Sequence, residues 1–146
     1  MTVSIFNGKR EDLIFYFYKE ESVKWHLEVH KNGGTKEENL KDTCNSIEDG
    51  SEIYTIYDGE TLCAFFVKYE TEGKQVLNGF HVLKEYRSKH FLTEFWQIVK
   101  SKFEGSIYTG LYCKNEPAIK SLMKAGFVMN NLVLHSNKVF LILKIE

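Results

Sequence analysis

Three basic residues stand close together where the apolar pattern of a strand gives way to that of a helix. They are Lys84, Arg87 and Lys89. The first turn of a helix has backbone N–H groups without intrahelical acceptors and carries the positive end of the helix dipole, which suits an anion. The three side chains add positive charge at the same place. This junction is therefore a candidate site for an anionic ligand.

Residues that could move protons lie on either side of this junction. His81 precedes it and has an ordinary pKa near neutrality, so it is a candidate general base, and Glu85 is a second candidate. Tyr108 and Tyr112 lie on the following predicted strand, and Tyr112 is a candidate proton donor. Each residue also has a non-catalytic interpretation. His81 could be a strand histidine without a catalytic role, Glu85 a solvated surface acid, and the tyrosines packing residues.

Metal ligands are not expected. His26 and His30 have the spacing of ligands on one helical face, but Leu27 stands where a zinc protease needs a glutamate. The cysteines form no C-x-x-C pair, which argues against a structural zinc site. They cannot all pair internally, and the N-terminus turns polar before a signal-peptide core forms, so we expect a cytoplasmic protein. These cysteines are Cys44, Cys63 and Cys113.

Length and composition predict one globular domain spanning residues 1–146, because 43% of the residues are hydrophobic, 27% are charged and only one is proline. Nineteen basic and 20 acidic residues give a net charge of −1, so no overall field draws in nucleic acid or an anionic membrane. The apolar runs at 13–18 and 62–67 are far below the roughly 20 residues needed to cross a bilayer. We expect neither nucleic acid nor membrane as a partner.

The first half of the chain predicts a strand, one or two helices and three strands. The strand covers 3–6, and the next segment, 11–30, favours a helix although Leu13–Tyr18 also suits a buried strand. Thr35 and Glu38 form a capping box that begins a helix running to about Ile47. Strands then follow around 53–57, 62–69 and 75–83, with an Asp58-Gly59 turn between the first two.

The second half alternates helices and strands. Apolar residues between Phe91 and Phe103 recur at helical spacing, a strand covers 106–112, and a helix begins at Asn115 and ends at Gly126. Two final strands cover 127–134 and 138–145. The order β-α-(α)-β-β-β-α-β-α-β-β predicts a mixed α/β fold.

Three segments together resemble the GNAT superfamily of acyl-CoA-dependent N-acetyltransferases. They are VLKEYRSK at 82–89, NEPAI at 115–119 and KAGF at 124–127. The resemblance covers most of the chain. It implies a central mixed, mostly antiparallel sheet of about six or seven strands flanked by helices.

In that family the fourth strand leads into a loop of the form V-x-P-E-Y-R-G-x-G-x-G/A, whose backbone amides and helix N-terminus hold the pyrophosphate of coenzyme A. An asparagine in the second segment hydrogen-bonds the pantetheine arm. The resemblance therefore implies these coenzyme-binding residues: Val82, Leu83, Arg87, Ser88, Lys89, His90, Phe91, Leu92 and Asn115.

The sequence departs from the family pattern at several positions. Lys84 replaces the usual proline, and His90 and Leu92 stand where small residues let the backbone approach the pyrophosphate. Leu122 falls at the position of the tyrosine that protonates the departing thiolate.

The resemblance implies transfer of an acetyl group from acetyl-CoA to the amine of a small molecule or protein, by direct attack in a ternary complex. A base must take a proton from the amine, a donor must stabilise the oxyanion, and the thiolate must leave. The implied oxyanion donor is the backbone N–H near Val82, freed where the fourth and fifth strands splay apart. We expect His81 and Tyr112 to be the catalytic side chains. A thiol pKa of about 8.5 makes its anion a tolerable leaving group even without an acid at Leu122.

Two alternatives stay open. The protein is either such an enzyme, whose donor can also be a longer acyl-CoA, or a non-catalytic protein of the same fold that serves as a partner-binding or assembly component, possibly phage-related. Monomer and homodimer are equally expected. The apolar final strand, rich in residues such as Val139, Phe140, Leu141 and Ile142, could pair across a dimer axis.

Overall fold

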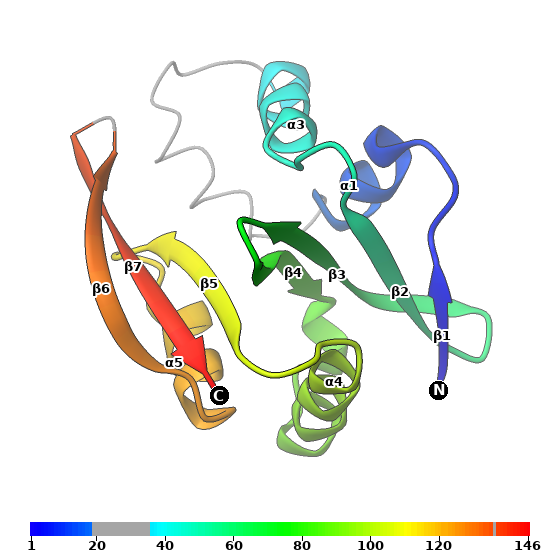
Figure 1. Cartoon of the computed structure of the whole chain (residues 1–146). Coiled ribbons are helices and arrows are strands. Elements are labelled where there is room, and N and C mark those ends of the chain that lie inside the picture. Colours follow the sequence, from blue (N-terminus) through cyan, green and yellow to red (C-terminus); the bar gives the residue numbers. More distant parts are fainter. Residues whose placement is uncertain (19–35, 136) are drawn as a thin grey trace.

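The computed structural model describes residues 1–18, 36–135 and 137–146 (Figure 1). The described residues form a seven-stranded sheet with helices on both faces. In chain order the elements are β1 (Thr2–Ile5), α1 (Arg10–Tyr18), α3 (Lys36–Asn45), β2 (Glu52–Asp58), β3 (Thr61–Thr71), β4 (Lys74–Val82), the 3₁₀ turn η1 (Lys84–Tyr86), α4 (Lys89–Ser101), β5 (Ile107–Tyr112), α5 (Glu116–Lys124), β6 (Val128–His135) and β7 (Lys138–Ile145). This order confirms the predicted mixed α/β fold.

The segment that suited both a helix and a strand, Leu13–Tyr18, lies in helix α1. Leu13, Ile14 and Phe17 are buried, and their spacing places them on one helical face toward the sheet. The expected continuation of this helix to His30, the His26 and His30 pair, and Thr35 of the expected capping box lie outside the described residues.

The strands follow the order β1-β2-β3-β4-β5-β7-β6. Every neighbouring pair is antiparallel except β4 and β5, which are parallel. The sheet is therefore mixed and mostly antiparallel, as the resemblance implies. The α4 helix connects the two parallel strands, because a parallel pair needs a crossover rather than a hairpin.

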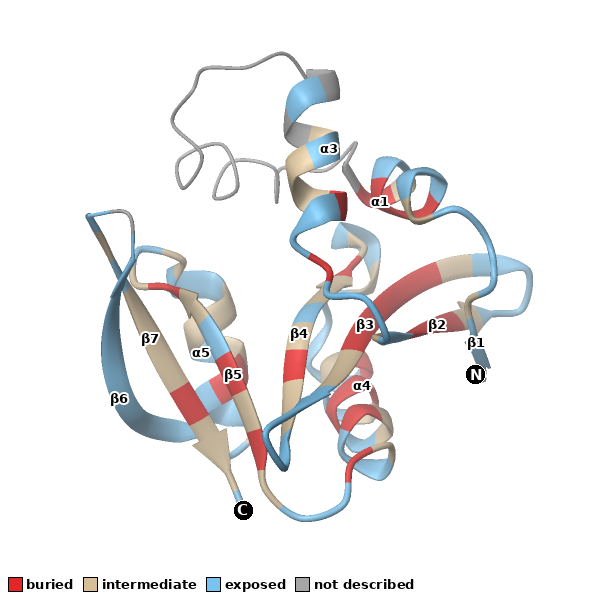
Figure 2. Ribbon diagram, turned by 45° about the horizontal axis from the view of Figure 1, so that its top comes forward, coloured by how far each residue is buried: buried red, intermediate tan, exposed pale blue. Residues whose placement is uncertain are grey.

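Two hydrophobic cores cover the two faces of the sheet. On one face, α4 and α5 bury the larger core, and the helical spacing predicted between Phe91 and Phe103 is confirmed. On the other face, α1 and α3 pack on β2 and β3 through the smaller core. Figure 2 shows both sets of buried residues in red along β3 and α4.

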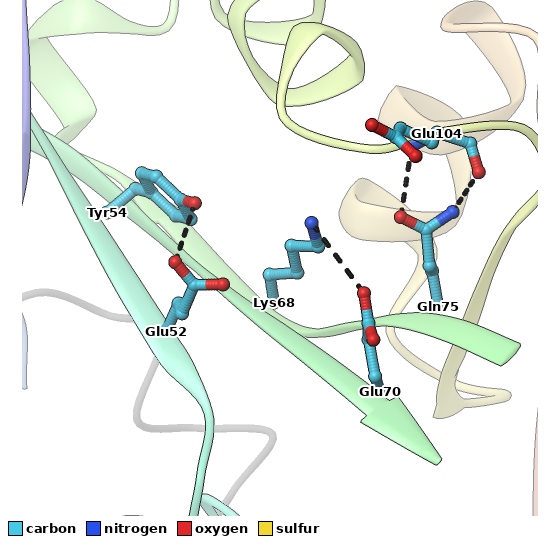
Figure 3. Close-up of polar contacts among 6 residues, drawn as sticks. All are labelled: Glu52, Tyr54, Lys68, Glu70, Gln75 and Glu104. Atoms are coloured by element: carbon cyan, nitrogen blue, oxygen red, sulfur yellow. Dashed lines mark hydrogen bonds and ion pairs between the residues drawn. The ribbon is translucent and has the colours of Figure 1, made fainter. Parts of the chain in front are cut away.

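The parallel strands β4 and β5 are paired only at their beginnings. Their register consists of Gln75 opposite Ile107 and Val76 opposite Tyr108. The side-chain amide of Gln75 accepts from the backbone N–H of Glu104 at 2.9 Å and donates to the carbonyl of the same residue (Figure 3). One step along, the Thr109 hydroxyl donates to the carbonyl of Leu77 at 2.9 Å. These contacts hold one end of the strand pair closed, and beyond them the strands diverge (Figure 1).

A β-bulge interrupts β4 just after this closed end. The register with β3 changes from Lys68 opposite Leu77 to Phe66 opposite Phe80, so Asn78 and Gly79 together oppose Val67. Gly79 has a φ of 134°, which a residue with a side chain rarely adopts. The bulge bends β4 where it separates from β5.

The expectation that the final strand could pair across a dimer axis is wrong. Strand β7 lies between β5 and β6, and its neighbours use both of its hydrogen-bonding edges. The chain returns into the sheet at β7, which leaves β6 at the border.

Candidate active site

The C-terminal end of β4, here called its outer end, presents backbone groups toward the gap that separates it from β5. The N–H of Leu83 donates to the carbonyl of Cys63 in β3 at 2.9 Å. Because N–H groups alternate sides along a strand, the N–H of Val82 points away from β3 and toward β5. The β5 ladder does not reach this level, and the N–H of Val82 has no acceptor among the described residues.

Arg87 lies against the same edge. Its Nε donates to the carbonyl of Val82 at 2.9 Å, so the guanidinium is turned back onto the end of β4. The sequence predicts Arg87 as an anion ligand, and the structure shows that this side chain also stabilises the strand end. Leu83 packs its side chain against the smaller core.

The α4 helix begins directly after this loop. Ser88 is its N-cap, and its hydroxyl accepts from the N–H of Phe91 at 3.2 Å. The N–H groups of Lys89 and His90 find no acceptor among the residues that the structure describes. The first turn of α4 therefore presents two backbone donors at its positive end.

The two large residues in this turn point away from those donors. The side chain of His90 is 87% exposed and lies 3.5 Å from the Glu94 carboxylate. Leu92 packs against the larger core, and Phe91 is buried in it. Neither departure from the small-residue pattern thus covers the backbone of the turn.

His81 lies on the α1 side of β4, close to its outer end. Its ring contacts the ring of Phe17 edge-on, with 5.1 Å between centroids, and Nε2 is buried without a hydrogen-bond partner among the described residues. Burial, together with the positive charge of Arg87, lowers the pKa of His81 to about 4. The imidazole is therefore neutral at pH 7 and can accept a proton or a hydrogen bond.

The tyrosines of β5 occupy different places. Tyr112 lies at the outer end of the strand, buried, with its ring 5.9 Å from that of Phe140. Tyr108 lies at the closed end, where the ammonium groups of Lys74 and Lys144 are 5.0 and 5.2 Å from its ring centroid. Only Tyr112 shares the diverging end with His81, and Glu85 is exposed in η1.

The second predicted segment begins α5. Asn115 is the N-cap residue of this helix, and its side chain makes no capping hydrogen bond. Leu122 is fully buried in the larger core. It therefore packs α5 against the sheet and presents nothing to a ligand.

Within the described part of the chain, no group of three or more His, Cys, Asp and Glu residues could hold a metal ion. The same residues include no helix with the length and apolar character of a membrane span.

Most predicted site residues thus meet at one end of the β4–β5 pair and the N-terminus of α4. Asn115 comes from the helix that follows β5. Sequence reasoning missed Gln75, Thr109 and Gly79, which shape the gap without facing it. A glycine after asparagine inside an apolar strand was the available signal for the bulge.

No protein-family model matches the chain, and no curated protein matches it in sequence. Solved structures do match over almost its whole length. An aminoglycoside N(6′)-acetyltransferase from Legionella pneumophila is 16% identical with a TM-score of 0.75, covering 98% of this chain and 90% of that one. A GNAT-family acetyltransferase from Bacillus anthracis is 13% identical with a TM-score of 0.65, covering 98% and 92%. A spermidine N-acetyltransferase from Vibrio cholerae, in complex with CoA and spermine, is 14% identical with a TM-score of 0.65, covering 99% and 94%.

At identities of 16%, 14% and 13%, these matches show the fold alone. The chain has the GNAT fold.

Proposed function

We propose that this protein is an N-acetyltransferase that moves the acetyl group of acetyl-CoA to an amine by direct attack in a ternary complex. The observation that carries the proposal lies at the C-terminal end of β4. There the N–H of Val82 lacks an acceptor among the described residues and lies beside the N-terminus of α4.

The residues present fit a phosphate-bearing coenzyme. The N–H groups of Lys89 and His90 lack acceptors among the described residues, and Lys89 adds a positive charge. His90 points to solvent and Leu92 to the core, so the backbone of the turn is accessible. Ser88, Phe91, Leu83 and Arg87 hold the loop in this shape. Asn115 would bind the pantetheine arm.

The catalytic roles follow from the same geometry. When bound, acetyl-CoA supplies the activated thioester carbonyl. The N–H of Val82 would stabilise the negative charge that develops on the carbonyl oxygen during attack. His81, neutral at pH 7, would accept the proton that the amine loses, and Tyr112 would donate a proton to the leaving sulfur. The amine nitrogen gains the acetyl carbon as the carbon–sulfur bond breaks.

The acceptor class stays as broad as the sequence predicts: the amine of a small molecule or a protein. Structures of similar fold include enzymes for aminoglycosides and spermidine. A shared fold does not specify which amine this chain acetylates.

A second candidate function rests on Arg87 and Leu122. Arg87 bonds to the chain itself, and the position of the usual acid is a buried leucine. A protein of this fold that binds a partner and no coenzyme would also have these two features.

Titration with acetyl-CoA by calorimetry separates the two candidates, with coenzyme A and adenosine 3′,5′-bisphosphate as companion ligands. We expect saturable binding, weakened at least about tenfold by Lys89→Glu, because a carboxylate replaces an ammonium at the positive end of α4. Lys41→Glu, an exposed lysine on α3, is the matched control and should bind normally. Both variants should keep the wild-type Tm, since exposed charges contribute little to stability.

Absence of binding at millimolar acetyl-CoA would contradict the enzyme proposal and favour the partner-binding alternative. Equal weakening by both variants would show that the coenzyme does not lie at α4.

A further inference from the structure

Strand β6 forms an open border of the sheet. Its one neighbour among the described strands is β7, so one of its hydrogen-bonding edges is unpaired there. All eight residues of β6 are exposed, and Figure 2 shows the strand in pale blue along its length. Unpaired strand edges of this length are templates for a further strand.

The border is also apolar. The exposed fractions are 48% for Met129, 61% for Leu132 and 70% for Leu134. These residues pair with Leu143, Leu141 and Val139 of β7. Because paired residues share a face and Leu143 belongs to the larger core, this apolar patch lies on the face that α4 and α5 cover. Val128 and Val133 are exposed as well, at 62% and 41%.

The usual protections of an edge strand are missing. Residues 128–135 include no Lys, Arg, Asp, Glu or Pro. The bulge at Asn130 lies near one end and leaves the segment from Asn131 to His135 in regular register with β7. The other border strand, β1, is only four residues long.

We propose that β6 is a self-association surface, on which β6 of a second copy pairs antiparallel about a two-fold axis to continue the sheet. The occupant is a second copy because the strand is uncharged and so does not repel its own image. An antiparallel pair of identical strands is the arrangement that a two-fold axis generates, with the same patch on both partners. The apolar patches of the two copies then lie side by side on one face.

The exposed area sets the strength of this contact. Full burial of a Leu, Val or Met side chain removes roughly 60–120 Å² of apolar surface from water. The five Val, Leu and Met residues of β6, about half exposed, offer on the order of 250 Å² per copy before main-chain groups are added. Stable interfaces bury about 1,200 Å² or more in total, so we expect a weak dimer with micromolar affinity.

Sedimentation velocity over protein concentrations from about 1 to about 300 μM, a range that brackets micromolar affinity, tests the proposal. We expect a reversible monomer–dimer equilibrium, with Leu132→Lys raising the dissociation constant at least about 30-fold. The matched control is Ile5→Lys, which places the same charge on an exposed apolar residue of the opposite border strand and should leave the equilibrium unchanged.

Amide exchange at low and high protein concentration locates the contact. Protection that rises with concentration in residues 128–135 supports β6 pairing. A monomer over the whole range, a dimer that Leu132→Lys leaves intact, or concentration-dependent protection elsewhere would each overturn the proposal. If circular dichroism shows that Leu132→Lys does not fold, Leu134→Lys replaces it, because Leu134 is still more exposed.

Discussion

Two effects lower the pKa of His81. Burial removes water from the imidazolium, and the charge of Arg87 repels it. The side chain thus stays neutral through the physiological range, at the cost of being a weak base. This suits a group that takes a proton only as the attacking amine becomes acidic.

A lowered pKa makes stability depend on pH. Below about pH 6.5 the unfolded chain protonates His81 while the folded protein does not, so the free energy of unfolding falls as the pH drops from about 6.5 toward 4. The loss attributable to this residue is about 2 to 3 kcal/mol. His81→Phe should reduce the fall by this amount between pH 7 and pH 4.5, as measured by urea denaturation. An unchanged slope in His81→Phe would contradict the assignment.

At the scale of elements, β4 and β5 combine a tied end with an open one. Gln75 and Thr109 supply side-chain hydrogen bonds at the tied end, and the bulge at Asn78 and Gly79 follows at once. The open end then carries Val82 and His81 on one strand and Tyr112 on the other.

Gln75→Ala removes both side-chain bonds to the main chain of Glu104. We expect a loss of about 1 to 2 kcal/mol in unfolding free energy, because each net hydrogen bond contributes about 0.5–1.5 kcal/mol. Gln97→Ala, at an exposed position of α4, is the control and should change stability by less than about 0.5 kcal/mol. Equal effects in the two variants, measured by chemical denaturation, would show that the tie does not contribute to stability.

The sequence predicts the elements well because their signals are local. The Asp58-Gly59 turn and the apolar spacing of α4 each specify structure within a few residues. The burial of His81 is not local, because it depends on Phe17, which a different helix supplies. The border position of β6 likewise follows from sheet order, which periodicity does not encode.

At the scale of the whole molecule, the larger core joins both parts of the sheet to α4 and α5. Phe95 lies at its centre, fully buried, with ring contacts to Phe66, Phe80 and Trp96. The nitrogen of the Trp96 ring donates to the Ser121 hydroxyl at 3.0 Å, which connects the two helices.

Phe95→Ala should lower the free energy of unfolding by about 3–5 kcal/mol, because it removes a ring and leaves a cavity. Met123→Ala, at a 53% exposed position of α5, should change it by less than about 0.5 kcal/mol. Urea denaturation of both variants checks the pair, and similar losses would contradict the placement of the core.

The short ladder between β4 and β5 also bears on how the chain reaches its final shape. Hairpins join β2 to β3, β3 to β4 and β6 to β7, so those contacts form between segments that are near in sequence. The parallel pairing of β4 with β5 requires that the chain first cross over through α4. Because only two positions are paired, the pairing itself contributes little stabilisation until the larger core has packed. We therefore expect the β4–β5 junction, and with it the free edge at Val82, to form late in folding.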